Sequence, residues 1–236
     1  MSDLYAGTSG WSYASWKPRF YPAKLASRGF LKYYATRLNS VEVNYTFRRF
    51  PAEKLLAGWI EVTPAHFQFA AKAHQTITHI KRLRDTQESL DRFIVSLQPL
   101  ASAGKLGPVL FQLPPFLKCD LVLLTDFLAI LPKGIRIAFE FRDDSWFCEP
   151  VFAALRSANA ALCEAESDRI ATPAVQTAGF AYLRLRKPSY SAAQRRQLAK
   201  EVAARLKIGD VFVYFKHEEA PEGALYAEAL QAAGSP

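Results

Sequence analysis

The chain has 236 residues, of which 50% are hydrophobic and 22% charged, so it can bury a substantial core and does not have the composition of a disordered protein. Its 30 Lys and Arg against 22 Asp and Glu leave a formal net charge of +8, which favours anionic partners without identifying one. No apolar run is long enough to span a membrane, and the first residues do not have the pattern of a secretory signal. The three cysteines are widely spaced and lack the spacing of a zinc site or a disulfide framework. We therefore expect a cytoplasmic protein with reduced thiols.

Eight short runs rich in β-branched and aromatic residues recur along the chain and predict strands. They cover residues 4–9, 40–47, 66–73, 108–114, 136–142, 160–166, 180–186 and 210–217. Helical patterns separate most of them and close the chain, over residues 30–38, 87–104, 120–132, 150–160, 191–207 and 221–234. Alternating strands and helices are typical of parallel βα units, so the sequence predicts an α/β fold with a single TIM-like (β/α)8 barrel over residues 1–236. A doubly wound open sheet is the alternative, but GTSG at 7–10 lacks the spacing of a nucleotide-binding turn.

The run SVEVNYTF at residues 40–47 indicates which way the strand faces point. Val41 and Val43 alternate with Glu42 and Asn44, and in a closed barrel one strand face meets the helices while the other meets the lumen. We therefore expect the valines to pack outward and the polar pair to point inward. The same alternation in other strands predicts a polar lumen that contains Glu42, Asn44, Lys72, Gln112, Glu140, Arg142, Glu164, Glu166, Arg184, Arg186 and Lys216.

Buried charge is costly unless it is paired, so such a lumen has to be a network of ion pairs. The four glutamates and five cations of this set can nearly neutralise one another. We expect Glu140 and Arg142 each to have a partner of opposite charge on another strand. Because the active sites of such barrels lie at the C-terminal strand ends, we expect the polar lattice to form a functional site rather than only a stabilising device.

The loops after the strands carry aromatic and basic residues. Residues 1–120 contain 16 Lys and Arg and 8 Asp and Glu, whereas residues 121–236 contain 14 of each, so the excess positive charge lies in the first half. The rings of Trp11, Trp16 and Trp146 are candidates for stacking on bases or sugars, with packing inside a lid as the alternative. The first three loops predict a positive crescent beside the mouth, formed by Lys17, Arg19, Lys24, Arg48, Arg49, His79, Lys81, Arg82 and Arg84.

Five ordered motifs run over most of the chain: GTSGWSYASWKPRFYP (7–22), SVEVNYTFRRFP (40–51), FQFAAKAHQTITHIKRL (67–83), LGPVLFQLPPFL (106–117) and AFEFRDDSWF (138–147). Together they resemble the YecE-like family, a domain of unknown function, and the resemblance implies a TIM-barrel-like fold. The positions that match the family pattern are Glu42, Asn44, Lys72, Thr78, His79, Gln112, Glu140, Arg142 and Trp146.

The chain departs from that pattern at three places near its C-terminal half. Glu166 stands where many members have Asp, and Arg186 with Lys187 replaces the His and Gly of an Arg-x-His-Gly motif that begins at Arg184. Lys216 and His217 replace an Asn-Asn pair. Any role that the histidine of this motif has in other members therefore cannot be assigned to this chain, which has Arg186 at that position.

The leading hypothesis is a protein that binds a phosphate-bearing ligand at the barrel mouth and acts on it as a phosphodiester hydrolase. Glu42 or Glu140 would be the general base, and Lys72, Arg142 and Arg184 would stabilise developing negative charge. The ligand would be an anionic small molecule or a single-stranded nucleic acid. Candidate ligand-binding residues are Asn44, Gln112, Arg142, Arg184, His79, Trp11, Trp16, Trp146, Arg48 and Arg49.

Two alternatives belong to other classes of protein. A sugar-processing enzyme, of glycosidase or isomerase type, would use Glu42 and Glu140 as its proton-transfer pair. A non-enzymatic nucleic-acid-binding module would use the basic loops without chemistry. Lys72 could form a Schiff base if its pKa were depressed by burial, but we expect the nearby glutamates to hold it charged.

Metal binding has little support in the sequence. Of the four histidines, His66, His74, His79 and His217, only the last two follow strand ends. Glu42, Glu140 and Glu166 could add oxygen ligands, but the abundant Lys and Arg of the same lumen oppose cation binding. We expect no site with several zinc ions, while a single Mg²⁺ or Mn²⁺ remains compatible with the residues present.

Overall fold

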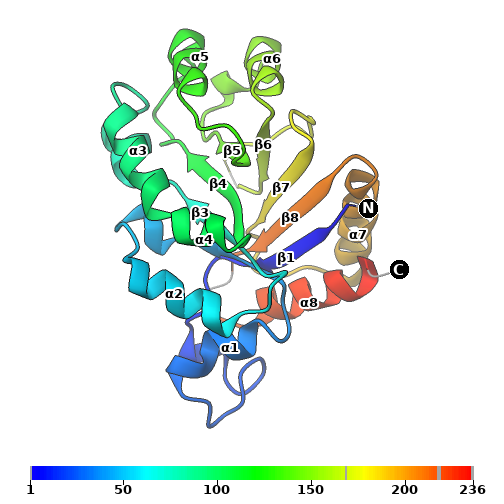
Figure 1. Cartoon of the computed structure of the whole chain (residues 1–236). Coiled ribbons are helices and arrows are strands. Elements are labelled where there is room, and N and C mark those ends of the chain that lie inside the picture. The colour runs from blue at the N-terminus through cyan, green and yellow to red at the C-terminus, as the bar shows by residue number, and fades with distance from the viewer. Residues whose placement is uncertain (1, 168, 217–218, 235–236) are drawn as a thin grey trace.

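The computed structural model describes residues 2–167, 169–216 and 219–234. Eight parallel strands follow one another around a nearly closed barrel with helices outside it, so the predicted TIM-like α/β barrel is confirmed (Figure 1). The sheet order is β1-β8-β7-β6-β5-β4-β3-β2. The strands are β1 Leu4–Thr8, β2 Ser40–Val43, β3 Gln68–Lys72, β4 Leu106–Gln112, β5 Ile137–Glu140, β6 Ala160–Ala165, β7 Phe180–Leu185 and β8 Asp210–Phe215.

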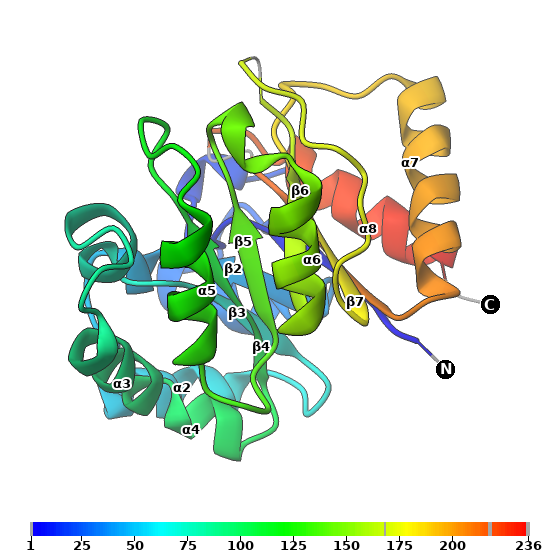
Figure 2. The same ribbon diagram turned by 90° about the horizontal axis from the view of Figure 1, so that it is seen from above.

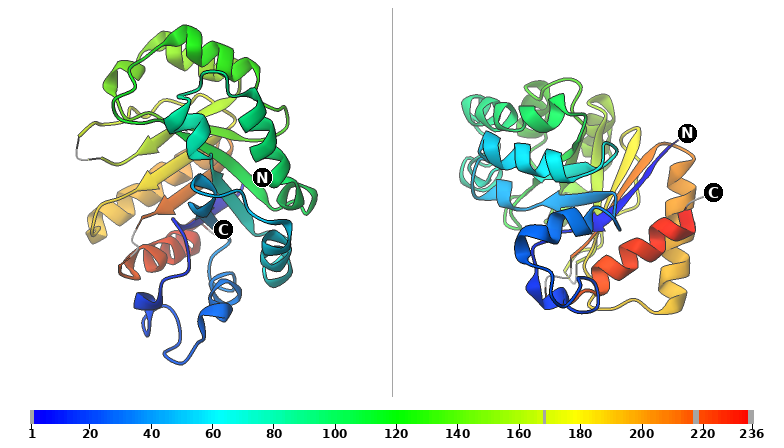
Figure 3. Two further views of the ribbon diagram at one scale, coloured as in Figure 1. Left: turned by 90° about the vertical axis from the view of Figure 1, so that its left-hand side faces the viewer. Right: turned by 60° about the horizontal axis from the view of Figure 1, so that its bottom comes forward.

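The helices form the outer layer around these strands. They are α1 Phe30–Tyr34, α2 Glu53–Val62, α3 Gln87–Ser96, α4 Gln98–Ser102, α5 Leu121–Ala129, α6 Glu149–Ser157, α7 Ala192–Leu206 and α8 Glu222–Gly234. Helix α8 runs along β1 and ends the circuit next to α1, where Arg37 Nε donates to Glu228 Oε1 at 2.8 Å (Figure 3). No helix in the described residues is long and apolar enough to cross a membrane.

Two connections of the outer layer stand out, one with a helix that the sequence did not predict and one without a helix. Helix α2, between β2 and β3, was not predicted; it buries Leu56 and Trp59 against the barrel. The connection between β6 and β7 contains no helix in its described residues, 166–167 and 169–179, and it runs between α6 and α7 (Figure 2). The helical layer is therefore interrupted at this one connection between consecutive strands.

Aromatic side chains fill the lower part of the lumen. Tyr5, Phe180, Tyr182, Phe212 and Tyr214 belong to one apolar cluster with small residues of β3, β5 and β6, and we call these five rings the aromatic floor. Tyr5 stacks on Phe212 with ring centroids 4.6 Å apart, and the rings of Tyr182 and Tyr214 lie 5.3 Å apart. The lumen is thus a packed core and not a pore, as is usual in barrels of eight strands.

The barrel closes between β1 and β2 through side chains instead of a regular backbone ladder. Between these strands there is one isolated bridge, Ser9 to Glu42, near the mouth. Lower down, Asn39 takes the place of a neighbouring strand: its Oδ1 accepts from the Ala6 amide at 3.0 Å and its Nδ2 donates to the Leu4 carbonyl at 2.7 Å. One amide side chain thereby satisfies two backbone groups that the missing ladder would leave unpaired.

Tyr34 of α1 completes this seam. Its hydroxyl accepts from the Thr8 amide and donates to the Ser40 carbonyl, both at 2.9 Å, so a single oxygen links β1 to β2. Gly7 makes room for this approach, because a Cβ there would lie 1.9 Å from the Ser40 carbonyl oxygen. A larger residue at this position would force the strands apart.

The seam yields the first prediction. Tyr34→Phe leaves the buried Thr8 amide and Ser40 carbonyl without their common partner, so we expect the free energy of unfolding to fall by about 1–3 kcal/mol. Urea denaturation measures the change. Tyr45→Phe is the matched control, because Tyr45 is exposed, and it should leave the midpoint unaltered. Equal midpoints for both variants would show that Tyr34 does not hold the seam.

Candidate functional site

A buried guanidinium joins two strands across the lumen above the aromatic floor. Arg184 of β7 donates through Nη2 to Glu42 of β2 at 2.7 Å and through Nη1 to Glu140 at the end of β5. The three residues are 3%, 0% and 1% exposed, respectively. The inward orientation of Glu42, Glu140 and Arg184, and the predicted ion pair of Glu140 with another strand, are confirmed.

Every carboxylate oxygen of this pair of glutamates accepts a hydrogen bond. Glu42 also accepts from Ser9 Oγ at 2.5 Å and Tyr182 hydroxyl at 2.8 Å. Glu140 Oε1 accepts from Gln112 Nε2 and from Arg186 Nη2, both at 2.8 Å. Burial alone would raise the pKa of each carboxyl, but the charge of Arg184 and the surrounding hydrogen bonds together outweigh burial and lower the pKa of Glu42 and, with the charge of Arg186, that of Glu140, the latter to about 2.

Lys72, at the end of β3, lies beside this network without joining it as an ion pair. Its Nζ donates to Gln112 Oε1 at 2.7 Å and lies 4.2 Å from the centre of the Phe47 ring. Burial and the nearby Arg184 guanidinium lower the pKa of Lys72 to about 8. Glu42 and Glu140 favour the charged form of this lysine, as expected, but burial and Arg184 outweigh them, so its pKa lies below that of an ordinary lysine.

Three cations gather around His79 at the mouth. Burial lowers the pKa of the imidazole, and the positive charges of Lys72, Arg142 and Arg48 lower it further. The ring meets Phe47 edge-on with centroids 4.9 Å apart, and its Nδ1 lies 2.9 Å from the hydroxyl of buried Thr78. The structure therefore brings together four residues that the sequence had assigned to the mouth from three different strands.

A cavity of about 620 Å³ opens beside the network, at the C-terminal ends of β5, β6 and β7. Its charged lining consists of Arg142, Arg169, Arg186 and Lys187 with Glu166. Arg186 links the cavity to the buried network through Glu140, and Lys187 lies 3.3 Å from Glu166. Arg142, by contrast, has no ion pair in the described part of the chain, so the predicted partner of Arg142 is wrong.

Strand β6 has the opposite phase from that predicted. Cys163 and Ala165 face the lumen, whereas Glu164 lies on the helix side, where Arg205 of α7 donates to it from Nε at 3.0 Å. Glu166 also lies outside, where it accepts from the Arg186 amide at 2.7 Å. The physical reason is space: the aromatic floor already fills this part of the lumen, so only small side chains of β6 fit inside.

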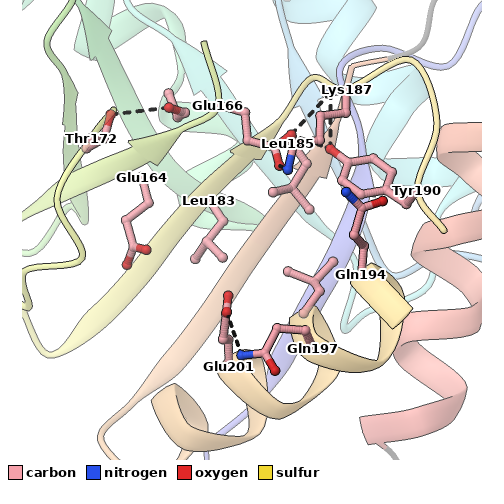
Figure 4. Close-up of a pocket in the computed structure, with 12 residues that line it drawn as sticks. Glu164, Glu166, Thr172, Leu183, Leu185, Lys187, Tyr190, Gln194, Gln197 and Glu201 are labelled. Atoms are coloured by element: carbon pink, nitrogen blue, oxygen red, sulfur yellow. Dashed lines mark hydrogen bonds and ion pairs between the residues drawn. The ribbon is translucent and has the colours of Figure 1, made fainter. Parts of the chain in front are cut away.

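The outward glutamates of β6 line a second cavity of about 270 Å³ between β6, β7 and α7 (Figure 4). Its walls are Leu183, Leu185 and Leu198, with Glu164 and Glu201 at one end. This cavity occupies the place where a helix between β6 and β7 would lie. It adjoins the larger cavity, because Ala165, Glu166, Thr172 and Lys187 line both.

Two of the three tryptophans proposed as stacking platforms are packing residues. Trp16 is fully buried against Phe20, and Trp146 is fully buried, stacked on Phe141 at 4.7 Å. The stacking role predicted for these two rings is therefore wrong. Trp11 is partly buried, edge-on to Trp59 at 5.1 Å.

The remaining predicted residues lie at the rim. Asn44 is partly buried after β2, and Arg48 and Arg49 are exposed. In the predicted crescent, Arg19 is paired with Glu222 and Arg84 with Asp120. Phe116, which is not among the predicted site residues, is 61% exposed and lies under the Arg82 guanidinium at 4.8 Å.

Metal donors do not cluster in the described residues, which contain no group of three or more His, Cys, Asp or Glu able to hold an ion. His66 is exposed, His74 packs on Phe50, and His217 lies outside the described residues. Cys119, Cys148 and Cys163 are free thiols.

Residues 5–235 match the family described as "Protein of unknown function DUF72". The chain belongs to the DUF72 family. Its resemblance to YecE-like proteins is thus confirmed over nearly its whole length.

Curated DUF72 relatives are similar over part of their length. The chain is 33% identical to the UPF0759 protein YunF of Bacillus subtilis over 155 residues, which are 63% of this chain and 54% of YunF. It is 30% identical to YecE of Escherichia coli K12 over 147 residues, 62% of this chain and 51% of YecE. The matches therefore span about half the length of these relatives.

Solved structures of DUF72 proteins share the fold. TM1631 of Thermotoga maritima superposes with a TM-score of 0.87 at 25% identity, over 98% of both chains. EF0366 of Enterococcus faecalis V583 gives a TM-score of 0.77 at 18% identity, over 98% of this chain and 97% of that one. The same barrel is therefore present in relatives whose sequences differ widely.

The buried network yields a prediction about stability. Arg184→Met removes the counter-ion of two buried carboxylates, so we expect it to lower the free energy of unfolding by about 3–5 kcal/mol. Arg142→Met, at the same mouth but outside any described ion pair, should change it by less than about 0.5 kcal/mol. Urea denaturation of both variants measures the difference. Similar losses in the two variants would contradict the central place of Arg184.

The network also predicts the pH dependence of stability. The pKa of Glu140 is about 2 in the folded chain, below its ordinary value, so between these values the unfolded state binds a proton that the folded state does not. The free energy of unfolding should therefore fall as the pH is lowered from about pH 5 to about pH 3. Urea midpoints over this range measure the slope, which should be smaller in Glu140→Gln than in the wild type. An equal slope in both proteins would assign the acid sensitivity to other groups.

Proposed function

We propose that this DUF72 protein binds a small phosphate-bearing molecule in the cavity beside the barrel mouth. The observation that carries the proposal is the lining of that cavity, in which Arg142, Arg169, Arg186 and Lys187 face one carboxylate, Glu166. Its volume of about 620 Å³ is in the range of small-molecule sites. An excess of fixed positive charge in a concave site concentrates anions there.

Unused hydrogen-bond donors support an oxyanion as the ligand. The Nε atoms of Arg184 and Arg186 are buried and have no hydrogen-bond partner among the described residues. A buried donor left unsatisfied costs about 1–3 kcal/mol, and because Arg186 lines the cavity, an oxyanion bound there would place acceptors near the Nε atom of Arg186. Phosphate offers several such oxygens and pairs well with guanidinium groups.

The two buried glutamates support a positioning role in this site and not proton transfer. A general base has to accept a proton, but the four carboxylate oxygens already accept hydrogen bonds, and both pKa values are lowered. The same argument weakens the sugar-processing alternative, which needs one carboxyl to act as an acid. We propose that Glu42 and Glu140 hold Arg184 and Arg186 in place for the ligand.

Calorimetric titration with inorganic phosphate and with ribose 5-phosphate tests this function. Arg142→Ala and Arg169→Ala each remove a cavity cation outside the buried network, and we expect each to weaken binding about tenfold through the loss of a charge-assisted contact. Arg156→Ala is the matched control, because Arg156 lies on α6 and pairs with exposed Glu149. Absence of phosphate binding to the wild type, or equal affinities for all variants, would refute the proposal.

A longer phosphate ligand would also contact the rim. Exposed Arg48 and Arg49, and Arg82 stacked over exposed Phe116, are the observations that favour single-stranded nucleic acid as a second candidate. The titration series therefore includes a labelled single-stranded oligonucleotide, with Arg48→Glu, Arg49→Glu and Arg82→Glu combined in one variant. Loss of oligonucleotide binding in this variant, with phosphate binding retained, would favour nucleic acid. Equal oligonucleotide binding by wild type and variant would reject it.

A further inference from the structure

Lys72 differs from the other lysines of the mouth and core in what its amine contacts. Its Nζ donates to one neutral acceptor, Gln112 Oε1, and otherwise rests on the face of Phe47. No carboxylate lies within ion-pair distance of it among the described residues. The nearby Glu42 and Glu140 form ion pairs with Arg184 and not with Lys72, so the Lys72 amine keeps hydrogen-bonding capacity at the mouth.

Two other lysines show the contrast. Lys105 is buried, and its Nζ donates to three neutral oxygens, the carbonyls of Ile60 and Thr63 and the Thr63 hydroxyl, so all three of its protons are used. Lys187 lies in the cavity, but its Nζ is 3.3 Å from Glu166. The first amine is fixed by its hydrogen bonds, and the second is held as a cation by a carboxylate.

Gln112 fixes the position of the Lys72 amine. Its Nε2 donates to Glu140 Oε1, which as a carboxylate oxygen can only accept, so its Oε1 has to face Lys72. Contacts of 2.7, 2.8 and 2.8 Å then run from Lys72 through Gln112 and Glu140 to Arg186, a residue of the cavity wall. These hydrogen bonds connect the amine to one residue of the cavity wall, and the charges of Lys72 and of Arg142, another wall residue, both act on His79.

We propose that Lys72 forms an imine with an aldehyde or ketone that carries the phosphate group bound in the cavity. The inference rests on the proposed function, since the cationic cavity would hold the anionic end of such a molecule. In the reaction, the amine lone pair forms a bond to the carbonyl carbon, and the π electrons of the carbonyl move to its oxygen. The two protons of the amine pass to that oxygen by way of solvent, the C–O bond breaks as the nitrogen lone pair completes the C=N bond, and water leaves, so amine and carbonyl give imine and water without any oxidant or reductant.

The acid–base state of Lys72 is compatible with this chemistry. Only the neutral amine has a lone pair for the attack, and an ordinary exposed lysine is almost wholly protonated near neutral pH. The pKa of Lys72, lowered to about 8 by burial and by Arg184, leaves a reactive fraction. Adduct formation should therefore become faster as the pH rises through about 8 and then level off.

Trapping with pyridoxal 5′-phosphate and borohydride, which reduces an imine to a stable secondary amine, tests the inference. Peptide mass spectrometry should locate the adduct on Lys72 in the wild type and in Lys187→Arg. Lys72→Arg keeps the charge but cannot form an imine, so its adduct should fall by about tenfold or more. Pyridoxal, which lacks the phosphate, should label Lys72 far more slowly, and inorganic phosphate should slow labelling of the wild type by competition.

The outcomes separate this inference from the proposed function. Adducts on Lys187, or spread evenly over exposed lysines, would overturn the imine inference. Calorimetric phosphate binding without any adduct on Lys72 would also overturn it, while leaving the phosphate site standing. Failure of both phosphate binding and labelling would remove the proposed function itself. The competition arm uses only wild-type protein, so it remains decisive if Lys72→Arg does not fold.

Discussion

The contact between Arg184 and its two glutamates is the constraint on which the upper half of the barrel depends. Three charges with less than 4% exposure each meet in the lumen, where an unpaired charge would be far more costly than any single apolar contact. Because Glu42, Glu140 and Arg184 come from β2, β5 and β7, the contact ties together strands that are not neighbours in the sheet. Tyr182 and Gln112 donate to the carboxylate oxygens that Arg184 does not contact, and Ser9 adds a second hydrogen bond to the Glu42 oxygen that Arg184 binds.

Neutralisation of these glutamates changes the electrostatic character of the mouth. Once Arg184 has satisfied the carboxylates, the charges of Lys72, Arg142 and Arg48 are not balanced locally, as the lowered pKa of His79 reflects. The charged residues of the lumen and mouth nearly cancel in number, but in the structure they divide into buried ion pairs in the interior and cations at the rim. Burial and the charge of Arg184 lower the pKa of Lys72, which lies at the boundary between these two parts.

The alternation of side chains along each strand predicted much of this arrangement. It placed Glu42, Glu140 and Arg184 in the lumen correctly, because apolar and charged residues alternate without ambiguity in those strands. It failed at Glu164 and Glu166, because the orientation of β6 is decided by aromatic rings from β1, β7 and β8 that compete for the same space. Short-range patterns contain no information about that competition.

Other features depend on contacts between distant parts of the chain, and so they could not be predicted locally. The burial of Trp16 and Trp146 follows from rings brought together by loops. The partners of Tyr34 and Asn39 exist only after the barrel has closed. Arg186 and Lys187 were noticed as departures from the family pattern, but their place in the cavity wall became apparent only from the fold.

The side-chain seam between β1 and β2 also bears on how this protein could associate with itself. Every other pair of adjacent strands is joined by a backbone ladder, so separation at the seam breaks fewer backbone hydrogen bonds than separation anywhere else around the sheet. An opened barrel would present two free strand edges, and such edges are templates for pairing with another chain. In the closed state Asn39 and Tyr34 cover the exposed amides and carbonyls of those edges. These two side chains therefore close the fold and also occupy backbone groups that could otherwise pair with another chain.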